Sequence, residues 1–208
     1  MLPDAVLREL AALRDVERDR RIVQLALRRS VVAAQSGGRL DDVAVCARSG
    51  GPIVSPSADI MLSASHHDDL TVLAVGRGGR ALGVDVEPVY EPGWDDALSE
   101  VLAASELRAL NLLSESERPG AYFACWTLKE AVMKALGEGL SDRDPKSVEV
   151  SVPPSPARLI ALDGRPVLTD WSLATLELGG WVCSVALLGG STGETQTRRW
   201  PVDLPPTA

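Results

Sequence analysis

Two short stretches carry acidic and basic residues at spacings that suit metal and phosphate chemistry. The first, GVDVE at residues 83–87, holds Asp85 and Glu87. Side chains alternate along a β-strand, so these two carboxylates would point to the same face. Hard oxygen ligands of this kind suit Mg²⁺ or Mn²⁺, which would relieve the repulsion between the two charges. The alternative, that a frayed strand end exposes both carboxylates to solvent before Pro88, stays open.

The second stretch, WTLKEAVMK at residues 126–134, has helical composition and contains Lys129, Glu130 and Lys134. On a helix Glu130 and Lys134 are i, i+4 neighbours, so a surface ion pair would explain them. The apolar residues around them leave the helix only a narrow polar side, and this favours a site over bulk water. Glu130 would then complete a three-carboxylate metal set with the acids of the first stretch, and the two lysines would hold phosphates.

A third polar stretch, SASHHDD at residues 63–69, contains both histidines of the chain, His66 and His67. We predict a turn between two strands here, in which the side chains of Ser65 and His66 bind phosphate oxygens. A histidine satisfied at the surface or in the core is the alternative, and the pattern assigns no role to His67.

The composition is that of an ordinary globular protein of 208 residues, with 45% hydrophobic and 24% charged residues. A net charge of −8 argues against a general nucleic-acid binder, which is normally basic. The sequence has no apolar run of about 18 residues, and its N-terminus lacks the order of a secretory signal. We therefore expect a cytoplasmic protein that binds neither nucleic acid nor membrane.

The three cysteines, Cys46, Cys125 and Cys183, lie far apart in apolar surroundings. They form no CxxC pair and fit neither a zinc site nor a disulfide framework. We expect each to be a small buried hydrophobe.

Apolar periodicity predicts a helix, then strands, then helices, then strands. Six arginines of the first helix are interpreted as a solvated face. The predicted elements are a helix within 4–34, strands at 43–47, 59–65, 70–75 and 81–87 with a hairpin turn at 76–79, helices within 94–140, and strands at 147–152, 157–162, 171–178 and 181–188 with a hairpin turn at Gly179–Gly180.

The helix-then-sheet order occurs twice, with a break at the prolines that follow residue 87. It predicts an α+β protein made of two similar α+β halves. The N-terminal half would span residues 1–88 and the C-terminal half residues 89–190. The Gly-, Thr- and Pro-rich tail at 191–208 is expected to be disordered.

Three pieces in this order resemble the 4′-phosphopantetheinyl transferases. They are SASH, then GVDVE about 20 residues later, then CWTLKEAVMKALGEGL about 40 residues further on. The closer resemblance is to the larger, monomeric, two-halved class that acts on carrier proteins of nonribosomal peptide, polyketide and related secondary metabolite biosynthesis. The resemblance covers about residues 17–188.

The resemblance implies a reaction in which coenzyme A and an apo acyl or peptidyl carrier protein give the holo-carrier and adenosine 3′,5′-bisphosphate. It also implies two halves with coenzyme A in the cleft between them, and a monomer. Carrier proteins are commonly acidic and so is this chain, so we predict docking through a local apolar or basic patch around residues 94–113. Two alternatives stay open: a relative that binds coenzyme A or a carrier without efficient transfer, and a Mg²⁺-dependent phosphate-ester hydrolase.

By the same resemblance, Asp85, Glu87 and Glu130 would bind Mg²⁺, and Glu130 would also be the base that deprotonates the carrier serine. Lys134 would be catalytic through the charge that develops on the phosphates, and both Lys134 and Lys129 would contact coenzyme A. Asp85→Ala is expected to abolish turnover and leave the fold intact, because an exposed carboxylate at a strand end contributes little to stability.

The nucleotide end of coenzyme A would lie against Ser65 and His66, which would hold its 3′-phosphate. Family members often carry a Gly-Lys-Pro turn before these residues, and Gly51 stands where that lysine would be. Arg20 and Arg21 of the first helix would compensate for the missing cation.

Overall fold

The structure is a computed structural model that describes residues 11, 15–37, 53–54, 60–68, 70–90, 95, 98–168 and 170–190. Four of the sequence-based expectations fall outside these residues: the strand at 43–47, the buried Cys46, the substitution at Gly51 and the disordered tail at 191–208. Among the described helices, none combines the length and apolar character needed to cross a membrane.

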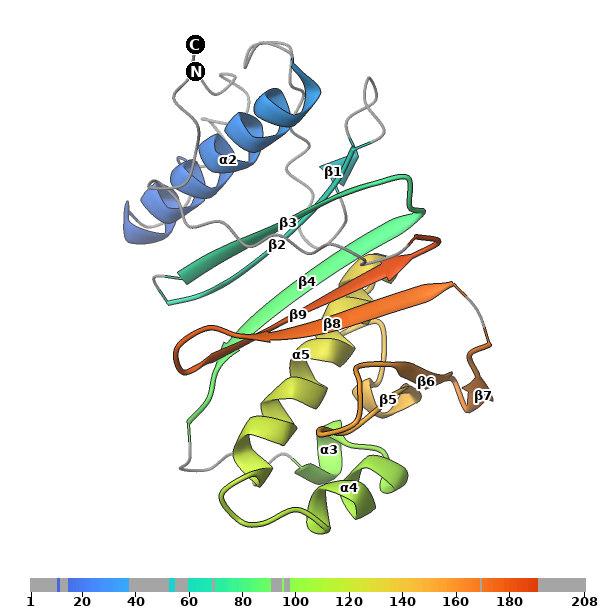
Figure 1. Ribbon diagram of the computed structural model, residues 1–208. Helices are drawn as coiled ribbons and strands as arrows, with labels where there is room; N and C mark the ends of the chain where they lie inside the picture. The colour runs from blue at the N-terminus through green and yellow to red at the C-terminus, as the bar shows by residue number, and fades with distance from the viewer. Residues whose placement is uncertain are drawn as a thin grey trace.

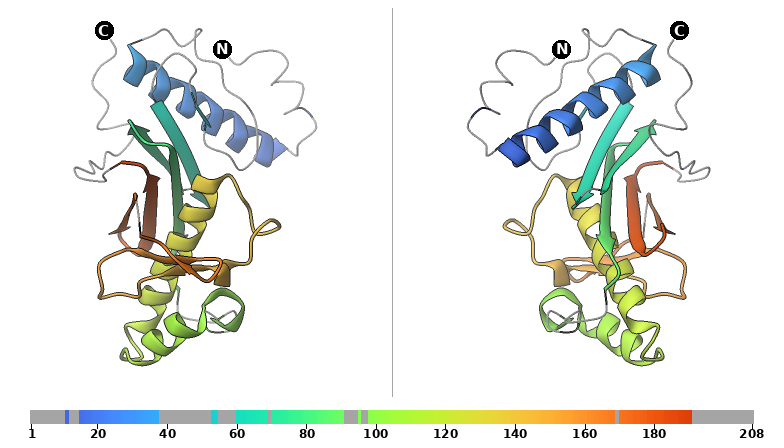
Figure 2. Two further views of the ribbon diagram at one scale, coloured as in Figure 1. Left: turned by 90° about the vertical axis from the view of Figure 1, so that its right-hand side faces the viewer. Right: turned by 90° about the vertical axis from the view of Figure 1, so that its left-hand side faces the viewer.

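Helix α2 and the first sheet form one end of the molecule (Figures 1 and 2). The sheet has the order β1–β2–β3 and is antiparallel. Val32 and Ala33 of the helix pack against Leu62 of the sheet, so apolar burial fixes α2 on this sheet. The bounds are α2 Asp15–Ser36, β1 Ile53–Val54, β2 Ile60–His67 and β3 Leu70–Arg77.

The central sheet has the order β4–β9–β8, and its neighbouring strands run antiparallel. Helix α5 crosses one face of this sheet (Figure 1). Gly179 and Gly180, with φ of 56° and 89°, form the predicted hairpin turn between β8 and β9. The bounds are β4 Ala81–Pro88, β8 Trp171–Glu177, β9 Trp181–Leu188 and α5 Arg118–Leu136.

A third small sheet, with the order β5–β6–β7, lies to one side of the middle of α5, and two short helices lie beside its N-terminal end (Figure 1). The largest apolar core of the described residues joins these elements to α5 and β9. The predicted α+β class is therefore confirmed. The bounds are α3 Leu98–Val101, α4 Ala104–Asn111, the 3-10 helix η2 Pro145–Ser147, β5 Val148–Val150, β6 Leu159–Leu162 and β7 Arg165–Pro166.

Two local predictions around β2 and β3 are wrong. Residues 76–79 do not form a hairpin turn, because β3 pairs with β2 whereas β4 pairs with β9. His66 and His67 are not in a turn either; they are the last residues of β2 and lie opposite Thr71 and Leu70 of β3. The turn follows them at Asp68, whose φ is 48°.

Strand β4 precedes the expected boundary between the halves, yet it pairs along its whole length with β9 from beyond that boundary. One sheet therefore contains strands from both sides of residue 88. The arrangement of two similar halves stays a prediction.

Helix α5 lies in direct backbone contact with β4 at Gly83. A Cβ atom built on Gly83 would lie 1.9 Å from the carbonyl oxygen of Ala131 and 2.7 Å from the backbone nitrogen of Ala135. Only a residue without a side chain allows this approach. The helix ends at Gly137, whose left-handed φ of 77° caps it. The glycine of GVDVE therefore brings the two charged stretches together.

Candidate active site

The charged stretches of β4 and α5 meet through Asp85 and Lys134. The Lys134 Nζ lies 2.6 Å from the Asp85 Oδ1. Asp85 is only 3% exposed, so its carboxylate is not at a frayed, solvated strand end. The cation closest to this acid is thus supplied by the chain itself.

Ser65 at the end of β2 closes a triangle with these two residues. Its Oγ donates a hydrogen bond of 2.8 Å to the Asp85 Oδ1 and accepts one of 3.0 Å from the Lys134 Nζ. Because neighbouring side chains of a strand point to opposite faces, His66 lies on the other face of β2 and is exposed. The structure therefore joins Ser65 to the acidic cluster but does not bring His66 there.

Two carboxylate oxygens of the cluster are buried without a hydrogen-bond partner among the described residues: the Asp85 Oδ2 and the Glu130 Oε1. The pKa of Glu130 is raised to about 7, first by burial and then by the charges of Asp85 and Glu87, while the charge of Lys134 opposes the rise. Buried oxygens without donors are unfavourable unless a proton or a cation satisfies them. The donor chemistry of these two atoms suits a hard cation.

These side chains are not arranged as a formed metal centre. Within the described part of the chain, no group of three or more His, Cys, Asp or Glu residues is placed to hold a metal ion. Asp85 and Glu87 are near enough to raise the pKa of Glu130. The Lys134 ammonium, however, lies beside Asp85. Binding of a divalent cation would therefore require these side chains to move closer together.

Glu87 is held from two sides. The His67 Nδ1 lies 2.6 Å from the Glu87 Oε2, and the indole of Trp126 also hydrogen-bonds the carboxylate. Burial raises the pKa of Glu87, and so does the charge of Asp85, whereas both hydrogen bonds oppose the rise. The imidazole of His67 lies edge-on to the ring of Trp181, with centroids 5.7 Å apart.

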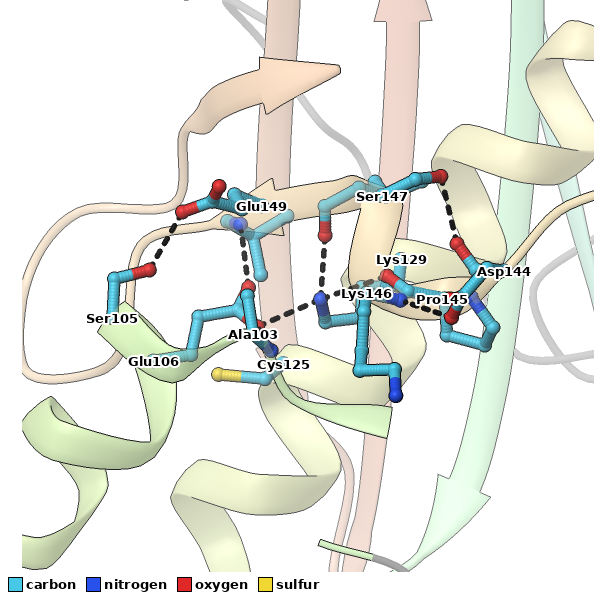
Figure 3. A network of polar contacts seen from close by, with 12 residues as sticks. Ala103, Ser105, Glu106, Cys125, Lys129, Asp144, Pro145, Lys146, Ser147 and Glu149 are labelled. Carbon is cyan, nitrogen blue, oxygen red and sulfur yellow. Dashed lines mark hydrogen bonds and ion pairs between the residues drawn. The ribbon is translucent and has the colours of Figure 1, made fainter. Parts of the chain in front are cut away.

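Lys129 points away from the cluster, and this corrects its assignment as a phosphate contact. Its side chain is 0% exposed, and its Nζ lies 2.7 Å from the Glu106 Oε2 (Figure 3). The same Nζ donates to the carbonyl oxygens of Pro145 and Val148, at 3.0 Å and 2.5 Å. An ammonium has three N–H donors, and all three are used here. No donor is left for coenzyme A.

Glu106, the partner of Lys129, is a residue that the sequence did not single out. Its Oε2 also accepts from the backbone N–H of Ala103, and its Oε1 accepts from that of Val150, each at 2.7 Å (Figure 3). The buried pair thus ties α4 and β5 to α5. Its sequence neighbourhood contains no charge pattern that points to a lysine 23 positions later.

The arginines of α2 do not form a simple solvated face, which corrects that interpretation. Arg29 is buried, and burial together with the charge of Arg21 lowers the pKa of Arg28. The Arg28 Nε is buried and has no hydrogen-bond partner among the described residues. This half-buried guanidinium suits an anion better than bulk water does. The side chain of Arg20 lies outside the described residues.

The two described cysteines are buried free thiols, as predicted. Burial raises the pKa of Cys125 and that of Cys183 to about 12. Neither thiol is a nucleophile near neutral pH.

The chain is similar to known proteins of one superfamily. A model of the 4′-phosphopantetheinyl transferase superfamily matches residues 81–186, slightly more than half of the chain. The 4′-phosphopantetheinyl transferase HetI of Nostoc sp. is 28% identical over 147 residues, which are 67% of this chain and 58% of that protein. The chain thus spans less than two thirds of the length of this relative.

Solved structures of two synthases are also similar. The holo-[acyl-carrier-protein] synthase of Thermotoga maritima matches 52% of this chain and 62% of its own, with 21% identity and a TM-score of 0.42. The holo-(acyl-carrier-protein) synthase of Bacillus anthracis str. Ames, in complex with CoA (3′,5′-ADP), matches 52% of this chain and 94% of its own, with 19% identity and a TM-score of 0.41.

The match to the superfamily begins at β4 and ends in β9. It therefore contains the strand with Asp85 and Glu87 and the helix with Glu130 and Lys134, whereas Ser65 lies before it. On this match, the chain belongs to the 4′-phosphopantetheinyl transferase superfamily.

Proposed function

We propose that this chain transfers the 4′-phosphopantetheine arm of coenzyme A to a serine of an apo acyl or peptidyl carrier protein, leaving adenosine 3′,5′-bisphosphate. The observation that carries the proposal is the pair of buried, unpartnered oxygens, the Asp85 Oδ2 and the Glu130 Oε1, beside the Lys134 ammonium. A cluster with excess acid and one mobile cation is suited to take up a divalent ion together with phosphates.

Mg²⁺, with Mn²⁺ as a substitute, fits this cluster by its donor chemistry. Asp85, Glu87 and Glu130 would hold it, since the charges of the first two raise the pKa of the third and a cation would relieve that repulsion. When bound, Mg²⁺ would neutralise charge on the pyrophosphate of coenzyme A. The two unpartnered oxygens would then gain the partner that the protein does not supply.

Glu130 is the base in this proposal. A carboxylate beside the proposed Mg²⁺ would lie where the attacking hydroxyl must arrive. It would take the proton of the carrier serine hydroxyl, directly or through a water molecule. The serine oxygen would form a bond to the phosphorus that bears pantetheine, and the bond from that phosphorus to the adenosine bisphosphate would break.

In the proposed reaction the Lys134 ammonium would move from Asp85 to the leaving phosphate, where negative charge develops. Its side chain is 26% exposed, so it has room to rotate toward a ligand at the edge of the cluster. Charge developing on a phosphate oxygen is stabilised by a cation already in place. Ser65, which contacts both Lys134 and Asp85, would hold these two side chains in position.

The nucleotide end of coenzyme A would be held by cations of α2. Arg28 has a buried Nε without a partner among the described residues, and Arg21 lies close enough to lower the pKa of Arg28. Two like charges held together in this way favour an anion such as the 3′-phosphate. The same proposal gives Arg20 and His66 a part in binding this phosphate.

Several finer features belong to the same proposal. We propose a monomer that binds coenzyme A between two α+β halves. A carrier of secondary metabolite biosynthesis would dock near residues 98–113, where Leu112 is 88% exposed. We place the reaction in the cytoplasm, where coenzyme A and carrier proteins meet.

The test is intact-mass spectrometry of a panel of apo-carrier proteins incubated with this protein, coenzyme A and Mg²⁺. We expect a gain of roughly 340 Da on the carrier serine, abolished by EDTA. Adenosine bisphosphate released without any carrier would indicate a hydrolase instead. No gain on any carrier, with coenzyme A still bound, would indicate a binding protein.

A further inference from the structure

Three side chains of β2 each contact a residue of β4. Ser63 accepts a hydrogen bond from the backbone N–H of Val84, Ser65 donates to Asp85, and His67 contacts Glu87. The residue numbers rise together, so β2 and β4 run in the same direction at this point. Alternation along β2 turns these three side chains toward β4.

His67 is the last of these contacts, and it belongs to no other part of the proposed reaction. Its Nδ1 is 2.6 Å from the Glu87 Oε2, a distance at which an imidazole N–H donates a strong hydrogen bond. The edge-on contact with Trp181 fixes the plane of the imidazole. A ring fixed in this way can hold the carboxylate in one orientation.

Glu87 has more freedom to reorient than the buried Asp85 does. Its side chain is 23% exposed and lies at the end of β4, next to Pro88, where a free glutamate side chain has several rotamers available. Trp126 holds it from the side of α5 and His67 from the side of β2. With the Oε2 taken by His67, the carboxylate keeps acceptor capacity for a cation.

We propose that His67 is a positioning residue that orients Glu87 toward the divalent cation of the acidic cluster. The proposal rests on the proposed function, because that function places the cation at Asp85, Glu87 and Glu130. Hydrogen-bond partners of metal-ligating carboxylates orient them, and their loss typically weakens metal binding by roughly 10–100-fold.

The test is calorimetric titration of the full chain with Mn²⁺ in the presence of coenzyme A. We expect His67→Ala to weaken Mn²⁺ binding by roughly 10-fold or more. In His67→Asn the amide nitrogen takes a place close to that of Nδ1, so most of the affinity should return. In His67→Gln the amide lies one bond further out, where it matches Nε2, so the affinity should stay low.

The comparison of the asparagine and glutamine variants guards against a general loss of folding. Both are polar and similar in size, and thermal unfolding is measured for each variant in EDTA. A transfer assay adds a second readout: the Mn²⁺ concentration for half-maximal rate should rise in His67→Ala, while the KM for the carrier stays unchanged.

Three outcomes would overturn the proposal. They are unchanged Mn²⁺ affinity in His67→Ala, tighter affinity in that variant, which would mean that His67 competes with the cation, and equal affinities in the asparagine and glutamine variants. Failure of the proposed function looks different: the wild-type protein would bind Mn²⁺ and transfer no arm to any carrier.

Discussion

The Lys134 Nζ lies 2.6 Å from the Asp85 Oδ1, so an ion pair joins α5 to β4 at the centre of the acidic cluster. This lysine neutralises the most buried acid of the cluster. The same ammonium and a divalent ion cannot both occupy the space beside that oxygen. A divalent cation bound at this cluster would therefore compete with Lys134 for Asp85, and a phosphate would give the lysine a second partner.

Asp85→Asn should abolish transfer and also destabilise the fold. The expectation that removing this carboxylate leaves stability unchanged is not supported, because Asp85 is buried and bonded to both Lys134 and Ser65. We expect a loss of about 1–3 kcal/mol in the free energy of unfolding, measured with urea. A variant as stable as the wild type would contradict the buried ion pair.

Lys134→Met should lower kcat by roughly 100-fold or more at saturating coenzyme A, since it removes a cation proposed to act on the leaving phosphate. Steady-state kinetics with a responsive carrier measures this. Lys146→Met is the matched control, because Lys146 is exposed on η2 and its ammonium has no contact with the cluster. Equal kcat values for the two variants would remove Lys134 from the mechanism.

The Glu106–Lys129 pair should prove structural. Lys129→Met leaves a carboxylate buried without its counter-charge, and we expect it to reduce the free energy of unfolding by about 3–5 kcal/mol. Combining it with Glu106→Leu should recover much of the loss. Below the unfolding temperature, the KM for coenzyme A should match that of the wild type. A raised KM for coenzyme A with unchanged stability would instead indicate that Lys129 contacts the phosphates of coenzyme A.

The cation-free protein should lose stability as the pH rises from about 4.5 to about 7. Glu130 has an ordinary pKa of 4.5 when the chain is unfolded and about 7 when it is folded, mainly because of burial. Between these values the folded protein binds more protons at this residue than the unfolded chain does, so stability falls with rising pH.

Glu130→Gln should flatten this decline, because the amide does not titrate. Thermal unfolding in EDTA at pH 5 and pH 8 measures the difference, and Glu100→Gln on the exposed side of α3 is the control. An equally steep decline in Glu130→Gln would show that another group is responsible.

Gly83→Ala should separate β4 from α5. The new methyl group would overlap the backbone of α5 at Ala131, and we expect a loss of about 3 kcal/mol or more together with a fall in transfer. Gly120→Ala offers a contrast within α5, because a Cβ at Gly120 meets no atom within 4 Å and alanine favours the helix. Urea unfolding of both variants should move in opposite directions.

Much of the architecture could be predicted from the sequence where the signal is local. The alternation in GVDVE, the apolar spacing of α5, the cap at Gly137 and the turn at Gly179–Gly180 are each contained in a few neighbouring residues. The strand and helix that carry the cluster were found for this reason.

The features that could not be predicted depend on contacts between distant segments. In the sequence Lys129 is next to Glu130, and this suggests a second phosphate ligand. Its actual partner is Glu106, a buried residue of α4. The hairpin expected at 76–79 depended on which strand accepts β4, and that partner, β9, lies about 100 residues later. Local patterns do not carry this information.

The side-chain contacts between β2 and β4 also have a mechanical consequence. No ladder of backbone hydrogen bonds joins these two described strands, whereas such ladders join each of them to its own sheet. Side-chain contacts yield by rotation about single bonds, but a ladder yields only when several backbone bonds break together. Under a force that pulls the two sheets apart, the molecule would part along this line, with Ser65, Asp85 and His67 at the opening edge.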